Sequence, residues 1–195
     1  MIFGHYNNEA LACVAALVNT ADGDDELLPD IAALDDFIRT WKWTGRRDRN
    51  DAELRGVHAL RARLRQLWEL DEAGVVELVN QLLREAQALP QLVKHDEWDY
   101  HLHATASDAP LATRMAVDAA MAIIDVVRAK ELGRLRRCEF PGCTSVVIDL
   151  SKNRSKRFCD AGCGNRAAVN AYRARQAGKH EPDAEPARKL PWRRG

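Results

Sequence analysis

The chain has 195 residues, of which 46% are hydrophobic and 30% charged, so it holds enough apolar material for a folded core. No run approaches the roughly 18 to 20 apolar residues of a membrane helix. The first residues also lack the basic stretch and the cleavage signal of a secretory peptide. These features argue against a membrane partner, and we expect a cytoplasmic location.

The charge is unevenly distributed along the chain, although the formal net charge is zero. Residues 134–195 hold 15 Lys and Arg against 6 Asp and Glu, a net charge of +9. The preceding 133 residues hold 14 against 23, a net charge of −9. This polarity indicates an acidic body that carries a basic appendage.

Helical periodicity dominates the first 130 residues. Apolar residues recur every three or four positions in five segments, which predicts five helices. These segments are residues 8–18, 29–38, 54–68, 71–86 and 110–130. Asp71 is a candidate N-cap of the fourth helix and Pro90 ends it. The fifth is apolar almost all round, which predicts a central place in the core.

A polar and apolar alternation marks residues 91–107 as a β-hairpin that turns around His95. His101 and His103 would then share one face, an arrangement that suits two metal ligands. A solvated polar face is the alternative. An enzyme built on these histidines is a rival to the non-enzymatic function that we expect.

Four of the five cysteines lie within 26 residues, at Cys138, Cys143, Cys159 and Cys163. Clustered cysteines in a cytosolic chain indicate a metal site rather than disulfides. Two close pairs, each from a tight turn, suit a tetrahedral site. Four thiolates complete the coordination of zinc, so we expect one structural Zn²⁺ ion. The fifth cysteine, Cys13, stands in an apolar run and is expected to be buried.

Two further elements are predicted around these cysteines. Residues 146–150 and 157–158 are expected to pair as a hairpin, with residues 151–154 as its turn. A helix is expected to begin at about Cys163, where its first backbone amides help to stabilise thiolates. Ala168, Ala171 and Tyr172 would supply the packing side of this helix.

Basic residues lie on both of these elements. Between residues 134 and 179, Lys and Arg outnumber Asp and Glu by 11 to 3. A basic helix beside a basic loop suits phosphate contacts, and Asn or Arg can reach base edges in a major groove. The predicted nucleic-acid contacts are Arg154, Lys156 and Arg157 in the loop, and Arg166, Asn170 and Arg173 on one helix face. A solvated basic face without a ligand is the alternative.

Three stretches resemble the CGNR-type zinc finger. They are CEFPGC at 138–143, DLSKNRSKRFC at 149–159, and CGNR at 163–166, the four residues that give the family its name. The preceding part, with ALACVAALVNT at 10–20, resembles the ABATE domain of stress-induced transcription regulators. The resemblance implies a DNA-binding transcriptional regulator that responds to stress or to an effector.

Asn165 and Arg166 also have structural interpretations. One turn into a helix beside the metal, Asn165 could bond the nearby backbone or a thiolate sulfur and so support the site. Arg166 could reach a phosphate, or it could pair with Asp149 inside the finger.

Together these features predict a mainly α chain with a small β-hairpin, in the α+β class. An α-rich regulatory domain at 1–131 precedes a treble-clef-like zinc finger at 134–178 and a disordered tail at 179–195. The expected partners are duplex DNA, a small-molecule effector at the N-terminal domain and a second copy in a homodimer. The alternative is a zinc-stapled module that binds RNA or protein without sequence-specific DNA recognition.

Overall fold

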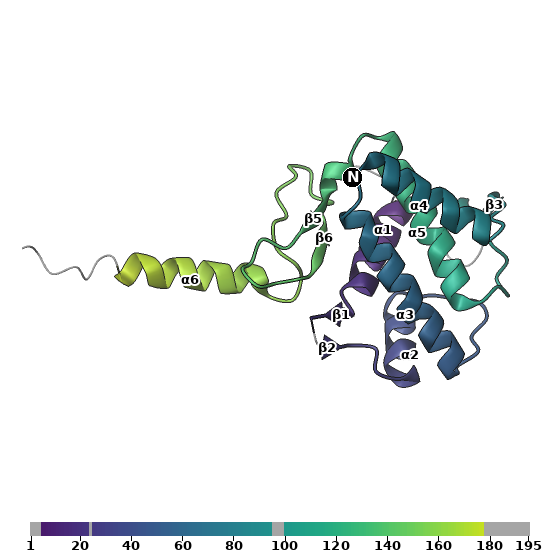
Figure 1. Ribbon diagram of the computed structural model, residues 1–195, viewed down its shortest axis with the longest axis horizontal. Helices are drawn as coiled ribbons and strands as arrows, with labels where there is room; N and C mark the ends of the chain where they lie inside the picture. The colour runs from purple at the N-terminus through teal and green to yellow at the C-terminus, as the bar shows by residue number, and fades with distance from the viewer. Residues whose placement is uncertain (1–4, 24, 95–99, 178–195) are drawn as a thin grey trace, which may run out of the picture.

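The computed structural model describes residues 5–23, 25–94 and 100–177, so the predicted tail lies outside the described residues. A helical body carries a small C-terminal unit whose last helix projects away from it (Figure 1). The helices of the body are α1 (His5–Val18), α2 (Ile31–Thr40), α3 (Asp51–Arg65), α4 (Glu72–Glu85) and α5 (Leu111–Arg128). Each of the five predicted helical segments is confirmed, and the mainly α class with it.

Side-chain caps define where three of these helices begin. The carboxylate of Asp30 accepts from Ala33 N at 2.8 Å, so α2 begins after it rather than at the preceding proline. Asn50 caps α3 in the same way. The predicted cap Asp71 accepts from Gly74 N at 2.9 Å and is confirmed. Each such cap contributes about 1 kcal/mol to helix stability.

Helix α5 occupies the centre of the body, packed against α1, α3 and α4 (Figure 1). Its Leu111 and Ile123 are almost completely buried, together with Leu11 of α1 and Leu64 of α3. Burial of each such side chain contributes roughly 1.5–3 kcal/mol. Among the described residues, no helix is both long enough and apolar enough to cross a bilayer.

The body also contains two small antiparallel sheets of two strands each. Strands β3 (Gln91–Val93) and β4 (His101–His103) pair with Leu92 opposite Leu102, which confirms the predicted hairpin. The turn expected at His95 lies outside the described residues. Strands β1 (Ala21–Asp22) and β2 (Asp25–Glu26) were not predicted, because two residues are too few to show an alternating pattern.

The third sheet differs from the prediction. Strand β6 (Val146–Ile148) pairs antiparallel with β5 (Leu135–Arg137), which precedes the first cysteine, and not with residues 157–158. The cause is Asp149, whose buried carboxylate accepts from Ser151 N at 3.0 Å and from Lys156 N at 2.9 Å. These bonds fold the residues after β6 into a loop around the carboxylate, so no returning strand forms.

Strand β6 joins the finger to the body. Val146 and Ile148 pack into the core of the body, whereas Val147 between them packs against the cysteine cluster. The side chain of Asn19, just after α1, accepts from Val146 N at 2.7 Å and donates to Val146 O at 2.9 Å. Trp68 Nε1 donates to Val147 O at 3.0 Å. The finger is therefore anchored by hydrogen bonds between side chains of the body and the backbone of β6.

A partly buried ion pair makes the stability of the body dependent on pH. Arg61, 9% exposed, binds Glu26, and this hydrogen bond lowers the pKa of Glu26 from 4.5 to about 2. A depressed pKa contributes stability above the unfolded value, and that contribution is lost as pH falls toward 2. Because the Glu26 side chain is 37% exposed, we expect this ion pair to contribute only about 1 kcal/mol to the free energy of unfolding.

Urea unfolding of the parent and of Glu26→Gln at several pH values measures this contribution. The parent should be more stable at pH 7, and the difference should shrink between pH 5 and pH 2, within about the range that the two pKa values define. Acid-induced zinc loss affects both proteins and cancels in the difference. A difference that stays constant with pH would contradict the assignment.

Candidate metal centre and nucleic-acid interface

The four clustered cysteines come together at one point. Their sulfur atoms all lie within 4.8 Å of one another. Cys143 Sγ lies 3.8 Å from Cys159 Sγ, which lies 3.4 Å from Cys163 Sγ. A tetrahedral zinc ion with bonds of about 2.3 Å requires sulfur separations of about 3.8 Å. The spacing of the sulfur atoms thus fits zinc without a large rearrangement.

Two tight turns bring each pair of cysteines together. A left-handed glycine precedes the second cysteine of each pair: Gly142, with φ 78°, before Cys143, and Gly162, with φ 82°, before Cys163. In the first turn, Cys143 N donates to Phe140 O at 3.0 Å. Only glycine adopts such φ values at little steric cost. The tight turns were predicted from the spacing of the cysteines.

The cluster is shielded from solvent. Cys163 is fully buried, and Cys138 and Cys159 are each 7% exposed. Burial raises the pKa of Cys163 to about 12 and also raises that of Cys138. Burial acts in the same direction on Cys143, but hydrogen bonds with Ser145 lower its pKa to about 7. Such buried thiols become stable anions beside a cation, as in a structural zinc site.

Arg166 supports the last cysteine. Helix α6 (Cys163–Ala177) begins at that cysteine, so Arg166 lies one turn along the same face. Arg166 Nη2 donates to Cys163 Sγ at 2.9 Å, and its guanidinium lies 4.8 Å from the centre of the Phe140 ring. Asn165 is exposed and its side chain makes no hydrogen bond to any described residue. The support expected from Asn165 is thus provided by its neighbour.

The three predicted loop cations lie at the surface, each in an ion pair. The pairs are Arg154 with Glu131 at 2.8 Å, Lys156 with Asp160 at 2.9 Å and Arg157 with Glu139 at 2.6 Å. Surface pairs contribute roughly 0–1 kcal/mol, so a phosphate can replace the carboxylate at small cost. Glu131 is only 16% exposed, but it keeps Arg134 as a second partner at 2.9 Å when Arg154 leaves. Asp149, the suggested partner of Arg166, instead lies beside Arg136 at 3.7 Å.

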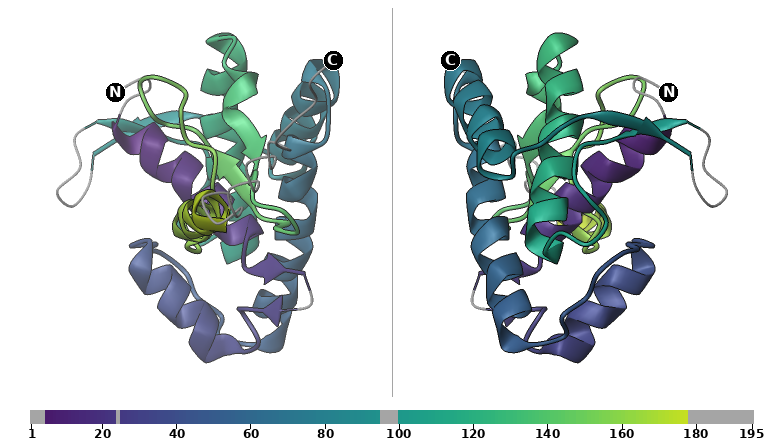
Figure 2. Two further views of the ribbon diagram at one scale, coloured as in Figure 1. Left: turned by 90° about the vertical axis from the view of Figure 1, so that its left-hand side faces the viewer. Right: turned by 90° about the vertical axis from the view of Figure 1, so that its right-hand side faces the viewer.

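The remaining predicted contacts, Asn170 and Arg173, lie on the projecting helix α6, which Figure 2 shows nearly end-on. Both are exposed, and Arg173 makes no ion pair with any described residue. The packing expected of Ala168, Ala171 and Tyr172 is not found, because all three are exposed; Tyr172 is 57% exposed, and the neighbouring Val169 is 46% exposed. Residues 168–176 of this helix are all exposed, so this part of α6 is available to a partner.

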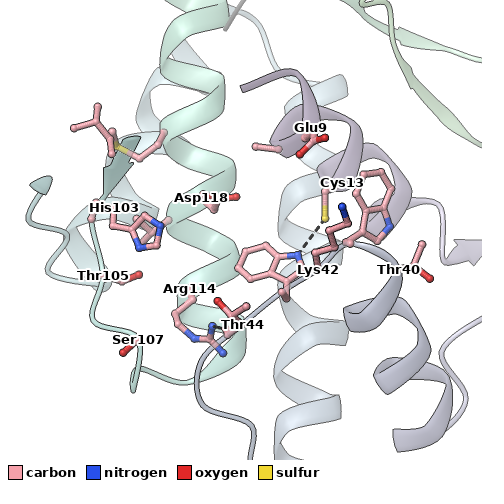
Figure 3. Close-up of a pocket in the computed structure, with 17 residues that line it drawn as sticks. Glu9, Cys13, Thr40, Lys42, Thr44, His103, Thr105, Ser107, Arg114 and Asp118 are labelled. Carbon is pink, nitrogen blue, oxygen red and sulfur yellow. Dashed lines mark hydrogen bonds between the residues drawn. The ribbon is translucent and has the colours of Figure 1, made fainter. Parts of the chain in front are cut away.

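A cavity of about 310 Å³ opens in the body (Figure 3). None of the four clustered cysteines lines it. Helices α1 and α5, the loop after α2 and strand β4 form its walls. Trp41 and Trp43 line it, and Trp43, like Trp68, also packs against the hydrophobic core.

The histidine hairpin is only partly described. His103 lines the cavity, and His95 lies outside the described residues. Within the described part of the chain, the four cysteines form the one group with metal-ligand geometry.

A four-cysteine cluster that opens a helix and is anchored to a helical body defines a zinc-finger protein. Residues 134–176 match the family model "CGNR zinc finger". Residues 11–130 match the ABATE family model, "Putative stress-induced transcription regulator". The chain therefore belongs to the ABATE family, with a CGNR zinc finger at its C-terminal side. No curated protein matches it. The finger match and the cysteine cluster together indicate one structural zinc ion.

Proposed function

We propose that this chain is a zinc-dependent, DNA-binding transcriptional regulator. Cys138, Cys143, Cys159 and Cys163 hold the zinc ion, and the finger at 134–178 binds duplex DNA. The helical domain at 1–131 responds to an effector. A cytoplasmic location and a non-catalytic role in the stress response are part of this proposal, in line with the family description.

Helix α6 is the observation that carries the proposal. A lone helix of 15 residues is only marginally stable in water. Here the turn at Gly162 and the zinc ligand Cys163 fix its first turn, and the rest extends into solvent. A helix about 10–12 Å across fits the major groove, which is about 12 Å wide. Asn170 and Arg173 then face base edges or phosphates.

The loop cations complete the interface. Arg154, Lys156 and Arg157 exchange their carboxylate partners for phosphates, which positions the finger on the duplex. Arg166 contributes charge at the base of α6 while one of its nitrogens stays on Cys163 Sγ. Since that bond links Arg166 to the metal centre, Arg166 is unsuited to testing DNA contacts alone.

Selection from a random duplex pool, with and without chelator, tests the proposal. The zinc-loaded chain should enrich a defined sequence, and chelation should abolish the enrichment. The double substitution Asn170→Ala and Arg173→Ala should weaken retention at least about 10-fold, because each base contact contributes roughly 1–3 kcal/mol. Arg39→Ala, an exposed arginine of α2, should have no effect.

Zinc content and helicity of each variant are measured in parallel. Retention should also fall with salt, with a log–log slope of about −0.9 per phosphate contacted. Unchanged affinity of the double variant, with its zinc retained, would show that α6 is not the reading element.

The exposed Val169 and Tyr172 favour a second candidate function. An aromatic ring on a basic helix can stack on an unpaired RNA base or pack against a protein. Zinc-dependent binding to single-stranded RNA or to an acidic protein, without binding to duplex DNA, would support it. The same face could join two copies into a homodimer, and sedimentation of the zinc-loaded chain decides its oligomeric state.

A further inference from the structure

The cavity in the body has the size and lining of a site for a small organic molecule. Its volume of about 310 Å³ lies at the lower end of the range of ligand sites, roughly 300–1,000 Å³. Trp41 and Trp43 provide aromatic surface on one wall, and Val117 and Met121 of α5 provide apolar surface on another. Hydroxyl groups such as that of Thr105 lie among them.

Two carboxylates line this cavity, each from a helix. Asp118 comes from α5, the central helix, and Glu9 from α1. Figure 3 shows Asp118 reaching toward the same space as Glu9 and Cys13. Carboxylates beside tryptophan rings are the surroundings that favour an organic cation, since both the charge and the ring faces attract it.

Two basic residues, Arg114 and Lys42, also line the cavity. Arg114, 7% exposed, donates to Ala109 O at 3.0 Å and to the carbonyls of Thr44 and Arg46, so its guanidinium is committed to holding a loop. An added Cβ at Gly45 would lie 2.8 Å from Arg114 Nη1, which shows how closely that loop is held. The guanidinium therefore acts as a structural clamp.

Lys42 also lines the cavity and is exposed. It follows α2 in a left-handed conformation, with φ 53°, where helices usually place glycine. Trp43 N donates to Ile38 O at 3.0 Å, which closes this helix end. Trp41 and Trp43 flank Lys42 in this turn, and both tryptophans line the cavity.

Cys13 forms part of the neutral wall. Trp43 Nε1 donates to Cys13 Sγ at 3.4 Å. Burial raises the pKa of this thiol to about 12, and the charge of Asp118 acts in the same direction. The thiol thus stays protonated, and the negative field of Asp118 reaches the cavity wall.

We propose that the cavity binds a small organic cation: a protonated amine on an aromatic or apolar body. The ammonium group lies between Asp118 and Glu9, and the body of the ligand lies against Trp41 and Trp43. The inference rests on the proposed role of the helical domain as an effector domain, and it specifies the chemistry of that effector.

Helix α1 gives such a ligand a route to the finger. Glu9, Ala10 and Cys13 of α1 line the cavity, and Asn19 just after the end of α1 holds Val146 of the finger strand. A ligand that shifts α1 therefore changes the position of Asn19, and with it the setting of the finger.

Calorimetric titration of the full zinc-loaded chain with tryptamine tests the inference. Tryptamine should bind saturably, and indole-3-propionate, which carries a carboxylate in place of the amine, should bind at least about 10-fold more weakly. Asp118→Asn should weaken tryptamine binding at least about 10-fold. The matched control is Asp125→Asn, an exposed aspartate two turns along the same helix, and it should bind like the parent.

Each outcome decides between defined alternatives. Failure of tryptamine to bind, tighter binding of the acid, or unchanged affinity of Asp118→Asn with its fold and zinc retained would overturn the amine site. DNA retention is measured separately on the same samples. Amine binding without DNA binding would support the amine site and contradict the proposed DNA-binding function. DNA binding without amine binding would support the proposed function and contradict the amine site.

Discussion

Chelation of zinc is expected to unfold the finger and abolish binding to nucleic acid. The cluster of Val147, Phe140 and Phe158 around the cysteines is too small to sustain this unit alone. Structural zinc contributes roughly 10–16 kcal/mol to the folding of finger peptides at neutral pH. The helicity contributed by α6 should fall, because the turn that starts the helix is lost.

Metal analysis and circular dichroism with increasing chelator measure this effect. The purified chain should contain one zinc ion per molecule, and replacement of Cys159 by Ser should reproduce the chelated state. Cys13→Ser serves as the control because Cys13 is remote from the cluster, and it should keep the metal. A chain that loses zinc yet retains its helicity and its DNA affinity would contradict the structural role of the ion.

Asp149→Asn is expected to destabilise the finger by about 2–4 kcal/mol. The carboxylate is fully buried and accepts from Ser151 N, Ser151 Oγ and Lys156 N. An amide offers one oxygen and turns a donor toward these groups, so buried N–H groups lose partners. The buried Arg134, which bonds the Asp149 carbonyl at 2.7 Å, would lose a nearby negative charge as well.

Thermal unfolding and zinc release rates of the two proteins provide the measurement. Asp160→Asn is the matched control, because Asp160 is 89% exposed and, within the described part of the chain, pairs only with Lys156 at the surface. That change should alter the midpoint very little. Equal effects of the two substitutions would mean that the loop does not depend on the Asp149 carboxylate.

The zinc site and the body helices were the most predictable parts of this chain. Cysteine spacing defines a metal site locally, since both members of each pair lie in one short turn. Caps such as Asp71 and long periodic segments such as 110–130 likewise depend on neighbours in sequence. The arrangement of the four sulfur atoms agrees with that local signal.

Contacts between distant residues were not predictable in this way. The partner of β6 was wrongly predicted, because the sequence does not show that the Asp149 carboxylate bonds backbone groups of the following loop. The bond from Arg166 to Cys163 has a local signal, their spacing of three on one helix, which was interpreted as a phosphate contact instead. The cavity needs Trp43, Asp118 and Cys13 to meet from three separate segments, and no pattern of spacing predicts such a meeting.

The alternation of β6 bears on how this protein can be engineered or recombined. Val147 packs against the cysteine cluster, whereas Val146 and Ile148 pack into the helical core. The boundary between the finger and the body therefore runs through this single strand rather than between two segments. A finger excised at Cys138 would leave behind β5, the partner of that strand, and would expose Val146 and Ile148 to water. Chimeras that exchange fingers within the family should therefore join ahead of Leu135 and keep apolar residues at positions 146 and 148 that fit the core of the recipient body.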